Sequence, residues 1–515
     1  MRLATVSQSR QIDLLSQSQG SLSSESLMEA AGVLAKTDIE TAFFPELLLG
    51  TVGVVCGPGG NGGDGLVVAR HLHTSKRTDS AKSSARVVVL LVAPQDKRSD
   101  LFKIQLERCL KAGVKVVDLL LDPANLDSFH LSLVVDAIFG VGFRDQIRDP
   151  YLKVIMQISK LGVPVVSLDI PSGLDADRGI VQGSAAIRAT RTITFGLSKP
   201  GFFVSEGPRH VGSIRVISIG FPDKIVREIA TSHFAFNEVL VRRTLPHRGT
   251  TTNKSDFGHA LVIAGSEGTW GAGVLAAMAA YRMGAGYVTL ATKEESSQKI
   301  FRDVLRDCPD VLTSLISDEK LWEKPKWNAV AIGPGLGRDK ESNEKIFALL
   351  QKLRKIPSAP VVVDADAISV IAEKKPYPLP ENWILTPHAG ELSRILGIAA
   401  KEIEADRYRY ALEAAKITGC HVLLKGFRTV LAFQGKCWVI LSGNSALAKA
   451  GTGDVLTGMI VALLAQKLPP ARAAAAAAYV HGRVADEWVR SGQDTRSLLA
   501  SDIREFLPSI LAGLS

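Results

Sequence analysis

Cysteines and aromatic residues are scarce in this sequence, and each scarcity excludes a class of protein. Only five cysteines occur among 515 residues, and no two have the spacing C-x-x-C, which argues against a disulfide framework or a thiolate zinc site. Aromatic residues make up 6% of the chain, and no cluster of lysine and arginine is interleaved with them, which argues against nucleic-acid binding. The net charge of +9 fits an anionic small-molecule substrate instead.

Long apolar runs are also missing from the sequence. No stretch of about 18 apolar residues occurs, and the first residues lead into polar serine and glutamine rather than into the apolar core of a signal peptide. We therefore expect a cytoplasmic protein without a membrane-spanning segment. The rest of the composition, 46% hydrophobic and 22% charged residues, is typical of a globular chain, and the length suits roughly three domains or two large α/β ones.

Short apolar runs, mostly β-branched, alternate with helical stretches along the whole chain. Runs that are apolar on successive residues are typical of parallel strands covered on both faces, so the sequence predicts an α/β fold. In the first half these runs are residues 52–56, 87–92, 133–136, 163–169 and 192–195. The alternation restarts at residues 260–264, 287–291, 329–332, 361–364, 383–386 and 422–425. We predict one domain over residues 1–225 and a second over residues 235–515, with the linker within residues 221–248.

A glycine-rich loop follows the first predicted strand and opens a helix. Residues 57–65 read Gly-Pro-Gly-Gly-Asn-Gly-Gly-Asp-Gly, and the N–H groups of such a loop favour a phosphate or pyrophosphate. The loop also fits G-x-G-x-x-G, but the next strand leads into Pro94 and Gln95 instead of the acidic residue that an NAD-dependent dehydrogenase needs. A tight strand-to-helix turn would use the same glycines, so this alternative stays open.

Acidic residues end two further strands of the first domain. Asp136 and Asp169 each end an apolar run, and the carboxyl ends of parallel strands face one crevice. We therefore expect both to converge with Asn61 and Ser172, which would place oxygen donors suited to a metal cation close together. The alternative is that both aspartates only cap the turns that follow them.

Together with Leu-Met-Glu-Ala-Ala-Gly at residues 27–32, these motifs resemble the YjeF N-terminal family, the NAD(P)HX epimerases. This family has a three-layer, Rossmann-like fold. Its loop usually reads N-N-G-G-D-G, where this sequence has Gly60 in place of the first asparagine. The resemblance implies a potassium ion held by Asn61, Asp136 and Ser172, and it implies Asp169 as the catalytic acid–base group. It also implies that the substrate is contacted by Asn61, Gly62, Gly63, Asp64, Gly140, Val141, Gly142, Phe143, Arg144, Asp145, Gln146 and Asp169.

A second set of motifs follows in the other half of the chain. Residues 451–454 read Gly-Thr-Gly-Asp and open an apolar helical stretch, whose N–H groups and dipole favour an anion. Asp454 is placed there to take the proton from a hydroxyl that attacks a phosphoryl group. A glycine turn with a capping aspartate is the alternative. Residues 425–429, Lys-Gly-Phe-Arg-Thr, offer a cation and a hydroxyl to the phosphates of a nucleotide.

Other predicted strands of this half also end in loops that favour a ligand. His388 lies in the loop Thr-Pro-His-Ala-Gly-Glu, and glycines recur in the loops at residues 265–273 and 333–337. Asp364 and Asp366 end a further strand. We expect the first three loops to approach a ligand closely, and Asp364 and Asp366 to help position a substrate or magnesium.

These motifs resemble the YjeF C-terminal family, the ADP- or ATP-dependent NAD(P)HX dehydratases, which have a ribokinase-like α/β fold. The resemblance covers residues 253–509, with Ser255 and Ser445 where the family has glycine and proline. It implies that an adenine nucleotide, with magnesium, is bound by Lys425, Gly426, Phe427, Arg428, Thr429 and Gly453. It also implies that the hydrated cofactor is contacted by Ala272, Gly335, His388 and the catalytic Asp454.

The order of the two domains matches the fused repair enzymes of bacteria, whose usual phosphoryl donor is ADP. We therefore predict an enzyme that interconverts the R and S forms of NAD(P)HX and dehydrates the S form to NAD(P)H, and we expect a homo-oligomer. The alternative is a ribokinase-like kinase for a vitamin precursor with an accessory N-terminal binding domain. The loop at residues 386–391 and the fused first domain argue against this kinase. Asn61 and Asp169 argue against a first domain without catalysis.

Overall fold

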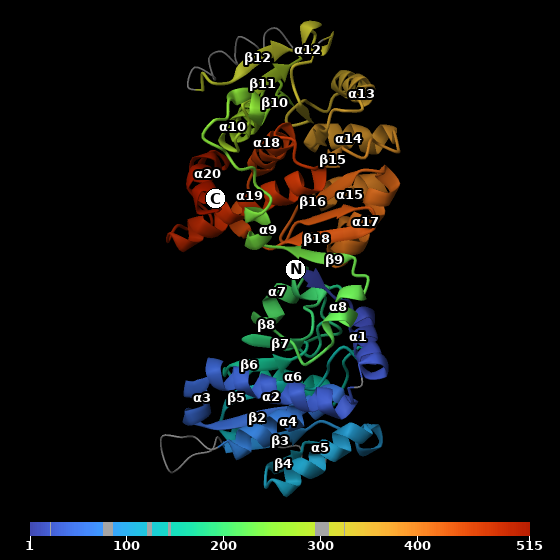
Figure 1. Cartoon of the computed structure of the whole chain (residues 1–515), viewed down its shortest axis with the longest axis vertical. Helices are drawn as coiled ribbons and strands as arrows, with labels where there is room; N and C mark the ends of the chain where they lie inside the picture. The colour runs from blue at the N-terminus through green and yellow to red at the C-terminus, as the bar shows by residue number, and fades with distance from the viewer. Residues whose placement is uncertain are drawn as a thin grey trace. The chain divides into compact units, whose positions relative to one another are not determined.

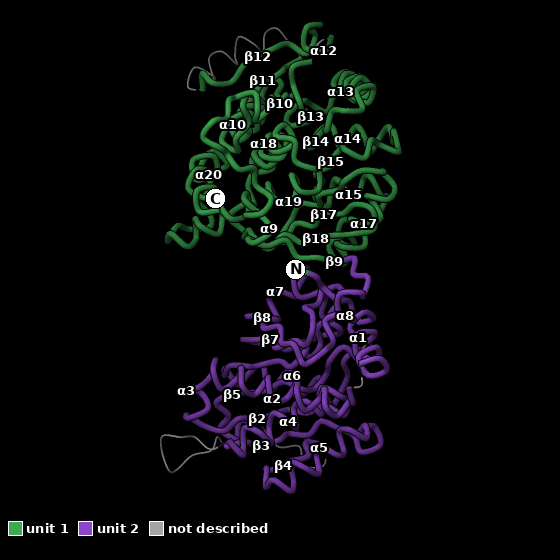
Figure 2. The backbone as a smooth tube through the Cα atoms, viewed as in Figure 1, with its two compact units in different colours: residues 1, 234–515 green, residues 2–233 purple. Residues whose placement is uncertain are grey.

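The computed structural model describes residues 1–20, 22–75, 86–120, 126–142, 146–293, 308–323 and 325–514. The chain forms two compact units, coloured separately in Figure 2: residues 2–233, and residues 234–515 together with residue 1. The stretch that we predicted as a linker, residues 221–248, contains α8 (Asp223–Glu228), β9 (His233–Phe236) and α9 (Glu238–Arg242). Its irregular pattern therefore reflects short elements rather than an extended connection.

The first unit is built on a seven-stranded sheet in the order β4-β3-β2-β5-β6-β7-β8, in which neighbouring strands are parallel. The order reverses between β2 and β5, because β3 and β5 lie on opposite sides of β2. Ligands of open α/β sheets bind at the carboxyl ends of the strands at such a reversal. The strands (Figure 1) are β2 (Thr51–Cys56), β3 (Arg86–Leu91), β4 (Lys115–Asp118), β5 (Leu131–Ala137), β6 (Val165–Leu168), β7 (Arg191–Phe195) and β8 (Ser213–Ile217).

Two separate sets of buried apolar side chains cover the two faces of this sheet. The helices α2 (Ser24–Ala42), α4 (Gly60–Thr74) and α5 (Asp100–Lys111) pack on one face. The helix α6 (Tyr151–Ile158) packs on the other face. The predicted three-layer α/β fold of the first unit is therefore confirmed. The other described helices of this unit are α1 (Val6–Gln19), α3 (Phe44–Leu49), α7 (Gly207–His210) and α8.

The sheet of the second unit runs in the order β9-β18-β17-β16-β15-β14-β13-β10-β11-β12. From β12 to β16 the neighbouring strands are parallel, whereas β16, β17 and β18 are antiparallel. The strands are β10 (His259–Ile263), β11 (Tyr287–Thr292), β12 (Leu312–Leu315), β13 (Ala329–Ile332), β14 (Val361–Val363), β15 (Ile384–Leu385), β16 (His421–Leu424), β17 (Val430–Phe433) and β18 (Lys436–Ile440).

One buried apolar cluster joins this sheet to α10 (Trp270–Arg282), α18 (Thr452–Ala465), α19 (Pro470–Arg490) and α20 (Ala500–Leu514). The helices α10 and α18 approach closely, since a Cβ on Gly458 would lie 2.0 Å from the carbonyl oxygen of Ala276. The other helices are α12 (Lys320–Glu323), α13 (Lys340–Arg354), α14 (Ala365–Lys374), α15 (Ala389–Leu396), α16 (Ala400–Ala405) and α17 (Arg407–Thr418). Within the described ranges, no helix has the length and apolar character needed to cross a membrane.

Candidate active sites

The glycine-rich loop brings the start of α4 to the carboxyl end of β2. A Cβ on Gly62 would lie 1.8 Å from the carbonyl oxygen of Gly57, so only glycine allows this approach. Gly63 lies under Met28 of α2, because its Cβ would lie 2.5 Å from the Met28 Cε. Both glycines, which we predicted as substrate contacts, are therefore packed against protein atoms, and Asn61 stands beside them in the first turn of α4.

The predicted potassium ligands Asn61, Asp136 and Ser172 belong to one hydrogen-bonded cluster. The Ser172 hydroxyl donates to Asp136 Oδ1 over 2.6 Å. The Ser167 hydroxyl and the Ser172 N–H donate to Asp136 Oδ2 over 2.8 and 2.9 Å. The Phe139 N–H donates to the Ser172 hydroxyl over 3.0 Å, and the Asn61 amide donates to the Phe139 carbonyl over 2.9 Å. The three residues are therefore connected, although they come from three different strand ends.

Two oxygen-bearing groups of this cluster lack a partner among the described residues: one lacks a cation and the other lacks a hydrogen-bond donor. Asp136 is fully buried, and burial raises its pKa, while hydrogen bonds from Ser172 and Ser167 act in the opposite direction. In the part of the chain that the structure describes, the donors to Asp136 are all uncharged. The buried Oδ1 of Asn61 accepts no hydrogen bond from the described residues. A buried carboxylate without a cationic partner and an unpaired carbonyl oxygen fit a monovalent cation.

Asp169 follows β6 and is held at the same strand ends by three contacts. Its Oδ2 accepts from the Val141 N–H over 3.2 Å. Its Oδ1 accepts from the Thr194 hydroxyl over 3.3 Å and lies 3.3 Å from the Lys199 Nζ. Asp169 is 8% exposed and Lys199 is 1% exposed. Unlike Asp136, Asp169 is therefore a buried carboxyl with a positively charged side chain beside it.

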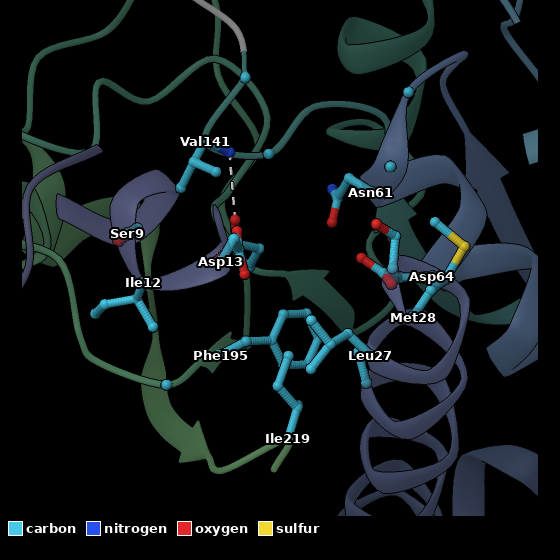
Figure 3. Close-up of a pocket in the computed structure, with 18 of the residues that line it drawn as sticks. Ser9, Ile12, Asp13, Leu27, Met28, Asn61, Asp64, Val141, Phe195 and Ile219 are labelled. Carbon is cyan, nitrogen blue, oxygen red and sulfur yellow. Dashed lines mark hydrogen bonds between the residues drawn. The ribbon is translucent and has the colours of Figure 1, made fainter. Parts of the chain in front are cut away.

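These strand ends line a cavity of 520 Å³, shown in Figure 3. Its apolar wall includes Leu27, Met28, Phe195 and Ile219. Gln146, a predicted contact, is exposed and is not among the residues that line the cavity. Phe143, Arg144 and Asp145 lie outside the described residues. The predicted substrate residues that do line the cavity are Asn61, Asp64, Gly140, Val141, Gly142 and Asp169.

Two charged residues of this cavity, Asp13 and Lys199, were not predicted from the sequence. Burial and the charge of Asp169 raise the pKa of Asp13 to about 6, against the opposing effect of Lys199. Burial, Asp169 and Asp13 raise the pKa of Asp64 well above its ordinary value. Lys199 comes shortly after β7, so its place behind a strand end could have revealed it. Asp13 lies on α1, where no strand-end signal points to it.

In the second unit, a lysine joins the ends of two strands to a helix. Lys425 follows β16, and its Nζ donates over 2.6 Å to Oδ1 of Asp364, which follows β14. Thr457 of α18 donates to Asp364 Oδ2 over 2.8 Å. Burial favours the neutral form of Lys425, but the carboxylates of Asp364, Glu391 and Asp454 outweigh it and raise the lysine pKa. Lys425 is therefore a cation held in place by a buried carboxylate.

Asp454 lies in the first turn of α18, next to this cation. Gly451, the residue before the helix, has a φ of +88°, a left-handed conformation that favours glycine. A Cβ on Gly453 would lie 3.5 Å from the Lys425 Nζ. Burial and the charge of Asp364 raise the pKa of Asp454 to about 7, against the opposing effect of Lys425. The first turn of α18 therefore lies close to the Lys425 ammonium, and it carries Asp454, whose pKa is near neutral.

His388 caps the first turn of α15. Its Nδ1 accepts from the N–H groups of Gly390 and Glu391 over 3.0 and 3.3 Å, and the Glu391 carboxylate accepts from the His388 N–H over 2.9 Å. Because Nδ1 accepts, the neutral ring carries its proton on Nε2, and the side chain is 57% exposed. Glu391 lies 4.0 Å from the Lys425 Nζ, so His388 borders the region of Lys425.

Ala272 and Gly335 lie beyond the carboxyl ends of β10 and β13, and Thr269 connects them. The Thr269 hydroxyl donates to the Gly335 carbonyl over 2.8 Å, and the Ala272 N–H donates to the Thr269 carbonyl over 3.2 Å. The Ser266 hydroxyl also donates to the Gly335 carbonyl over 2.8 Å. These two predicted contacts are therefore brought together at neighbouring strand ends.

The turn between β16 and β17 carries the rest of the predicted nucleotide contacts. Gly426 has a φ of +144° and lies against the buried guanidinium of Arg407. The Phe427 side chain is exposed. Arg428, in contrast, is largely buried, and this burial lowers the pKa of its guanidinium. The Thr429 hydroxyl donates to the Gly426 carbonyl over 3.2 Å.

Among the described residues, no group of three or more His, Cys, Asp or Glu side chains could hold a metal ion. Both oxygens of Asp364 already accept from Lys425 and Thr457. Asp366 accepts from the Gly337 N–H over 3.0 Å and from the Arg338 Nε over 2.6 Å. The predicted pair Asp364 and Asp366 is therefore engaged by protein donors.

Fold and sites together define an α/β enzyme with two separate sites, one in a Rossmann-like unit and one in a ribokinase-like unit. Residues 24–201 match the family model described as YjeF-related protein N-terminus. Residues 260–509 match the family model described as NAD(P)H-hydrate dehydratase. The ADP/ATP-dependent NAD(P)H-hydrate dehydratase from Bacillus subtilis, co-crystallized with ATP/Mg²⁺, is 34% identical and covers 55% of this chain and 99% of its own, with a TM-score of 0.48.

Two relatives resemble the chain over both units. The bifunctional NAD(P)H-hydrate repair enzyme of Moorella thermoacetica is 37% identical over 100% of this chain and 97% of its own. That of Escherichia coli is 34% identical over 89% of this chain and 84% of its own. The chain belongs to the family of bifunctional NAD(P)H-hydrate repair enzymes, and the resemblance stated from the motifs is confirmed.

Proposed function

We propose that this protein repairs hydrated nicotinamide dinucleotides, NAD(P)HX, with one reaction in each unit. The first unit interconverts the R and S forms, and the second unit uses ADP to dehydrate the S form to NAD(P)H, with release of AMP and phosphate. The proposal rests chiefly on one observation. Asp454 and Lys425 lie close together at the start of α18, in the unit that matches the NAD(P)H-hydrate dehydratase family. The net charge of +9 suits these anionic substrates.

The dehydration begins by converting the C6 hydroxyl of the hydrated ring into a phosphate ester, because water is a poor leaving group. Asp454 takes the hydroxyl proton while the oxygen attacks the terminal phosphoryl group of ADP, and AMP leaves. A carboxyl with a pKa of about 7 is both available as a base and basic enough to hold this proton near neutral pH. The N–H groups at the start of α18 and the Lys425 ammonium stabilise the transferred phosphoryl group.

The phosphate ester then eliminates. The lone pair of the ring nitrogen expels phosphate from C6, and loss of a proton from C5 forms the C5=C6 double bond of NAD(P)H. Ala272, Gly335 and His388 would contact the ring, while the turn after β16 would hold the nucleotide. Magnesium would be held by the phosphate oxygens of ADP and would offset their charge.

In the first unit, Asp169 is the acid–base group of the epimerisation. As the C6 hydroxyl leaves with a proton, the ring nitrogen forms a double bond to C6, and water adds to the other face and loses a proton to Asp169. The raised pKa values of Asp13 and Asp64 keep a proton available in the same cavity for the departing hydroxyl.

Potassium fits the cluster beside this cavity. The unpaired Asn61 Oδ1, the buried Asp136 carboxylate and the Ser172 hydroxyl would hold it, on the grounds of their donor types and of the missing counter-charge. Bound there, the ion would balance the charge of Asp136 and favour negatively charged groups of the substrate.

Two assays test the two units separately. Incubation of S-NADPHX without nucleotide should yield the R form by chromatography, and absence of the R form would contradict the epimerase. Incubation of S-NADPHX with ADP and magnesium should restore the absorbance of the reduced nicotinamide and release an equal amount of AMP, with ATP tested in parallel. Nucleotide consumption that does not depend on the hydrated dinucleotide would contradict the dehydratase and favour a kinase.

A further inference from the structure

Lys199 is a fully buried lysine at the wall of the epimerase cavity, and the reactions described so far give it no part. Burial of an ammonium group is costly unless the group is paired and hydrogen-bonded. An apolar side chain of similar length would fill the same space without that cost. The cost of burying this charge therefore indicates that Lys199 has a functional role in the cavity that it lines.

The position of the Lys199 ammonium is set by its own segment of chain. Its Nζ donates to the Leu197 carbonyl over 3.0 Å, to the Thr194 hydroxyl over 3.1 Å and to the Phe195 carbonyl over 3.4 Å. These acceptors lie at the end of β7 and in the turn that follows it. The cation is therefore held in place before any contact with Asp169 is counted, and it stands 3.3 Å from the Asp169 Oδ1.

Among the described residues, three carboxyls line the cavity, and the Lys199 Nζ lies 3.3 Å from one of them, Asp169. Figure 3 labels Asp13 and Asp64 on opposite sides of the view. Within the described ranges, the charges of Asp169 and Lys199 act on Asp13, and those of Asp169 and Asp13 act on Asp64, but no close ion pair holds either side chain in place. Asp169 alone receives Lys199 and the Thr194 hydroxyl, which accepts from Lys199 over 3.1 Å and donates to Asp169 over 3.3 Å.

We propose that Lys199 is a positioning residue of the epimerase site, which holds Asp169, with Thr194 as a bridge, as the carboxylate that takes the proton from the incoming water. The Lys199 ammonium and the Thr194 hydroxyl both approach the same oxygen, Asp169 Oδ1, and two donors on one oxygen fix its orientation. The inference rests on the epimerase function proposed above. It explains why Asp169 is the carboxyl of the cavity that is held in a fixed position.

The first test compares Lys199→Ala with the wild-type protein in the conversion of S-NADPHX to the R form without nucleotide. We expect kcat to fall by about a hundredfold while KM changes little, because the base is misplaced rather than the substrate lost. Dehydration with ADP by the same chain should be unchanged, which shows that the loss is confined to the first unit. Lys103→Ala removes a 58% exposed lysine of α5 and should leave both rates unchanged.

Chemical rescue separates the charge of Lys199 from its volume. Ethylammonium should restore much of the epimerisation rate of Lys199→Ala, whereas ethanol, which is neutral and similar in size, should not. Equal rescue by both compounds would mean that the lysine only fills space, and this result would overturn the proposal. An epimerisation rate of Lys199→Ala within about threefold of wild type would overturn it as well.

Thr194 provides a second test that does not depend on Lys199→Ala folding. Thr194→Val keeps the shape but removes the bridge, so we expect kcat for epimerisation to fall by about tenfold, and Thr194→Ser should retain the wild-type rate. Equal rates for these two variants would contradict the bridge. A wild-type protein that does not epimerise would instead contradict the proposed function of the first unit, so the two failures can be told apart.

Discussion

Replacement of Asp454 by asparagine is the substitution that separates the two proposed reactions. Asparagine has nearly the same shape, so the start of α18 and the position of Lys425 should persist. It cannot accept a proton, so the C6 hydroxyl would have to attack the phosphoryl group without a base. Because Asp454 lies in the second unit and Asp169 in the first, epimerisation should continue at the wild-type rate.

The size of the effect follows from what Asp454 contributes. General-base catalysis by a placed side chain supplies about 10²–10⁴-fold in rate, so kcat for dehydration should fall by at least about a hundredfold, which is about 2.7 kcal/mol in the barrier. KM for ADP should stay the same or fall, because Asp454 is a negative charge close to where the phosphates would bind. The raised pKa of Asp454 arises from burial and from Asp364, so its neutral replacement should not destabilise the fold.

The assay follows the absorbance of the reduced nicotinamide during dehydration of S-NADPHX with ADP and magnesium. The same preparation is then tested for the R form without nucleotide. Retention of more than about a tenth of the wild-type kcat for dehydration would show that Asp454 is not the base. Loss of epimerisation together with dehydration would show that the substitution disturbs the whole chain, and the separation of the two reactions would be refuted.

Three further predictions concern the cation, the pH dependence and the glycine loop. Exchange of potassium for tetramethylammonium should lower epimerisation and leave dehydration unchanged, whereas equal rates in both salts would contradict the cluster around Asp136. For dehydration, kcat/KM should rise about tenfold per pH unit below about 7 and level off above it, since Asp454 must be ionised to act as a base; a flat profile would argue against this role. Gly62→Ala would place a Cβ 1.8 Å from the Gly57 carbonyl oxygen, so it should destabilise the first unit by about 1–3 kcal/mol. The Tm of that unit should fall by about 2–4 °C per kcal/mol. Gly60→Ala is the control: no atom lies within 4 Å of its Cβ, so Tm should be unchanged.

The central strands were predictable because they are buried on both faces. The runs at residues 52–56 and 133–136 reappear as β2 and β5, shifted by at most two residues at either end. The edge strands β4 and β8 were missed, since both are partly exposed and lack a continuous apolar run. The hairpin of β17 and β18 was missed as well, although Gln434 and Gly435 between two apolar runs, both with positive φ, are typical of its turn.

The candidate sites were predictable where a side chain directly follows a strand. Asp169 and Lys425 do so, Asp136 lies at the end of β5, and parallel strands end at one edge of a sheet. The partners of these side chains were not predictable in the same way. The contacts of Lys425 with Asp364 and of Asp169 with Lys199 depend on the order of the strands. Asp13 lines its cavity from the helix α1, and this position can be recognised only in the folded structure.

The most direct measurement of the central claim uses a mixture of R- and S-NADPHX with the purified protein, potassium, magnesium and ADP. If one chain both epimerises and dehydrates, the absorbance of the reduced nicotinamide should recover completely, including the part that was present as the R form. Recovery that stops when the S form is exhausted would contradict an active first unit. No recovery beyond the protein-free control would contradict the account as a whole.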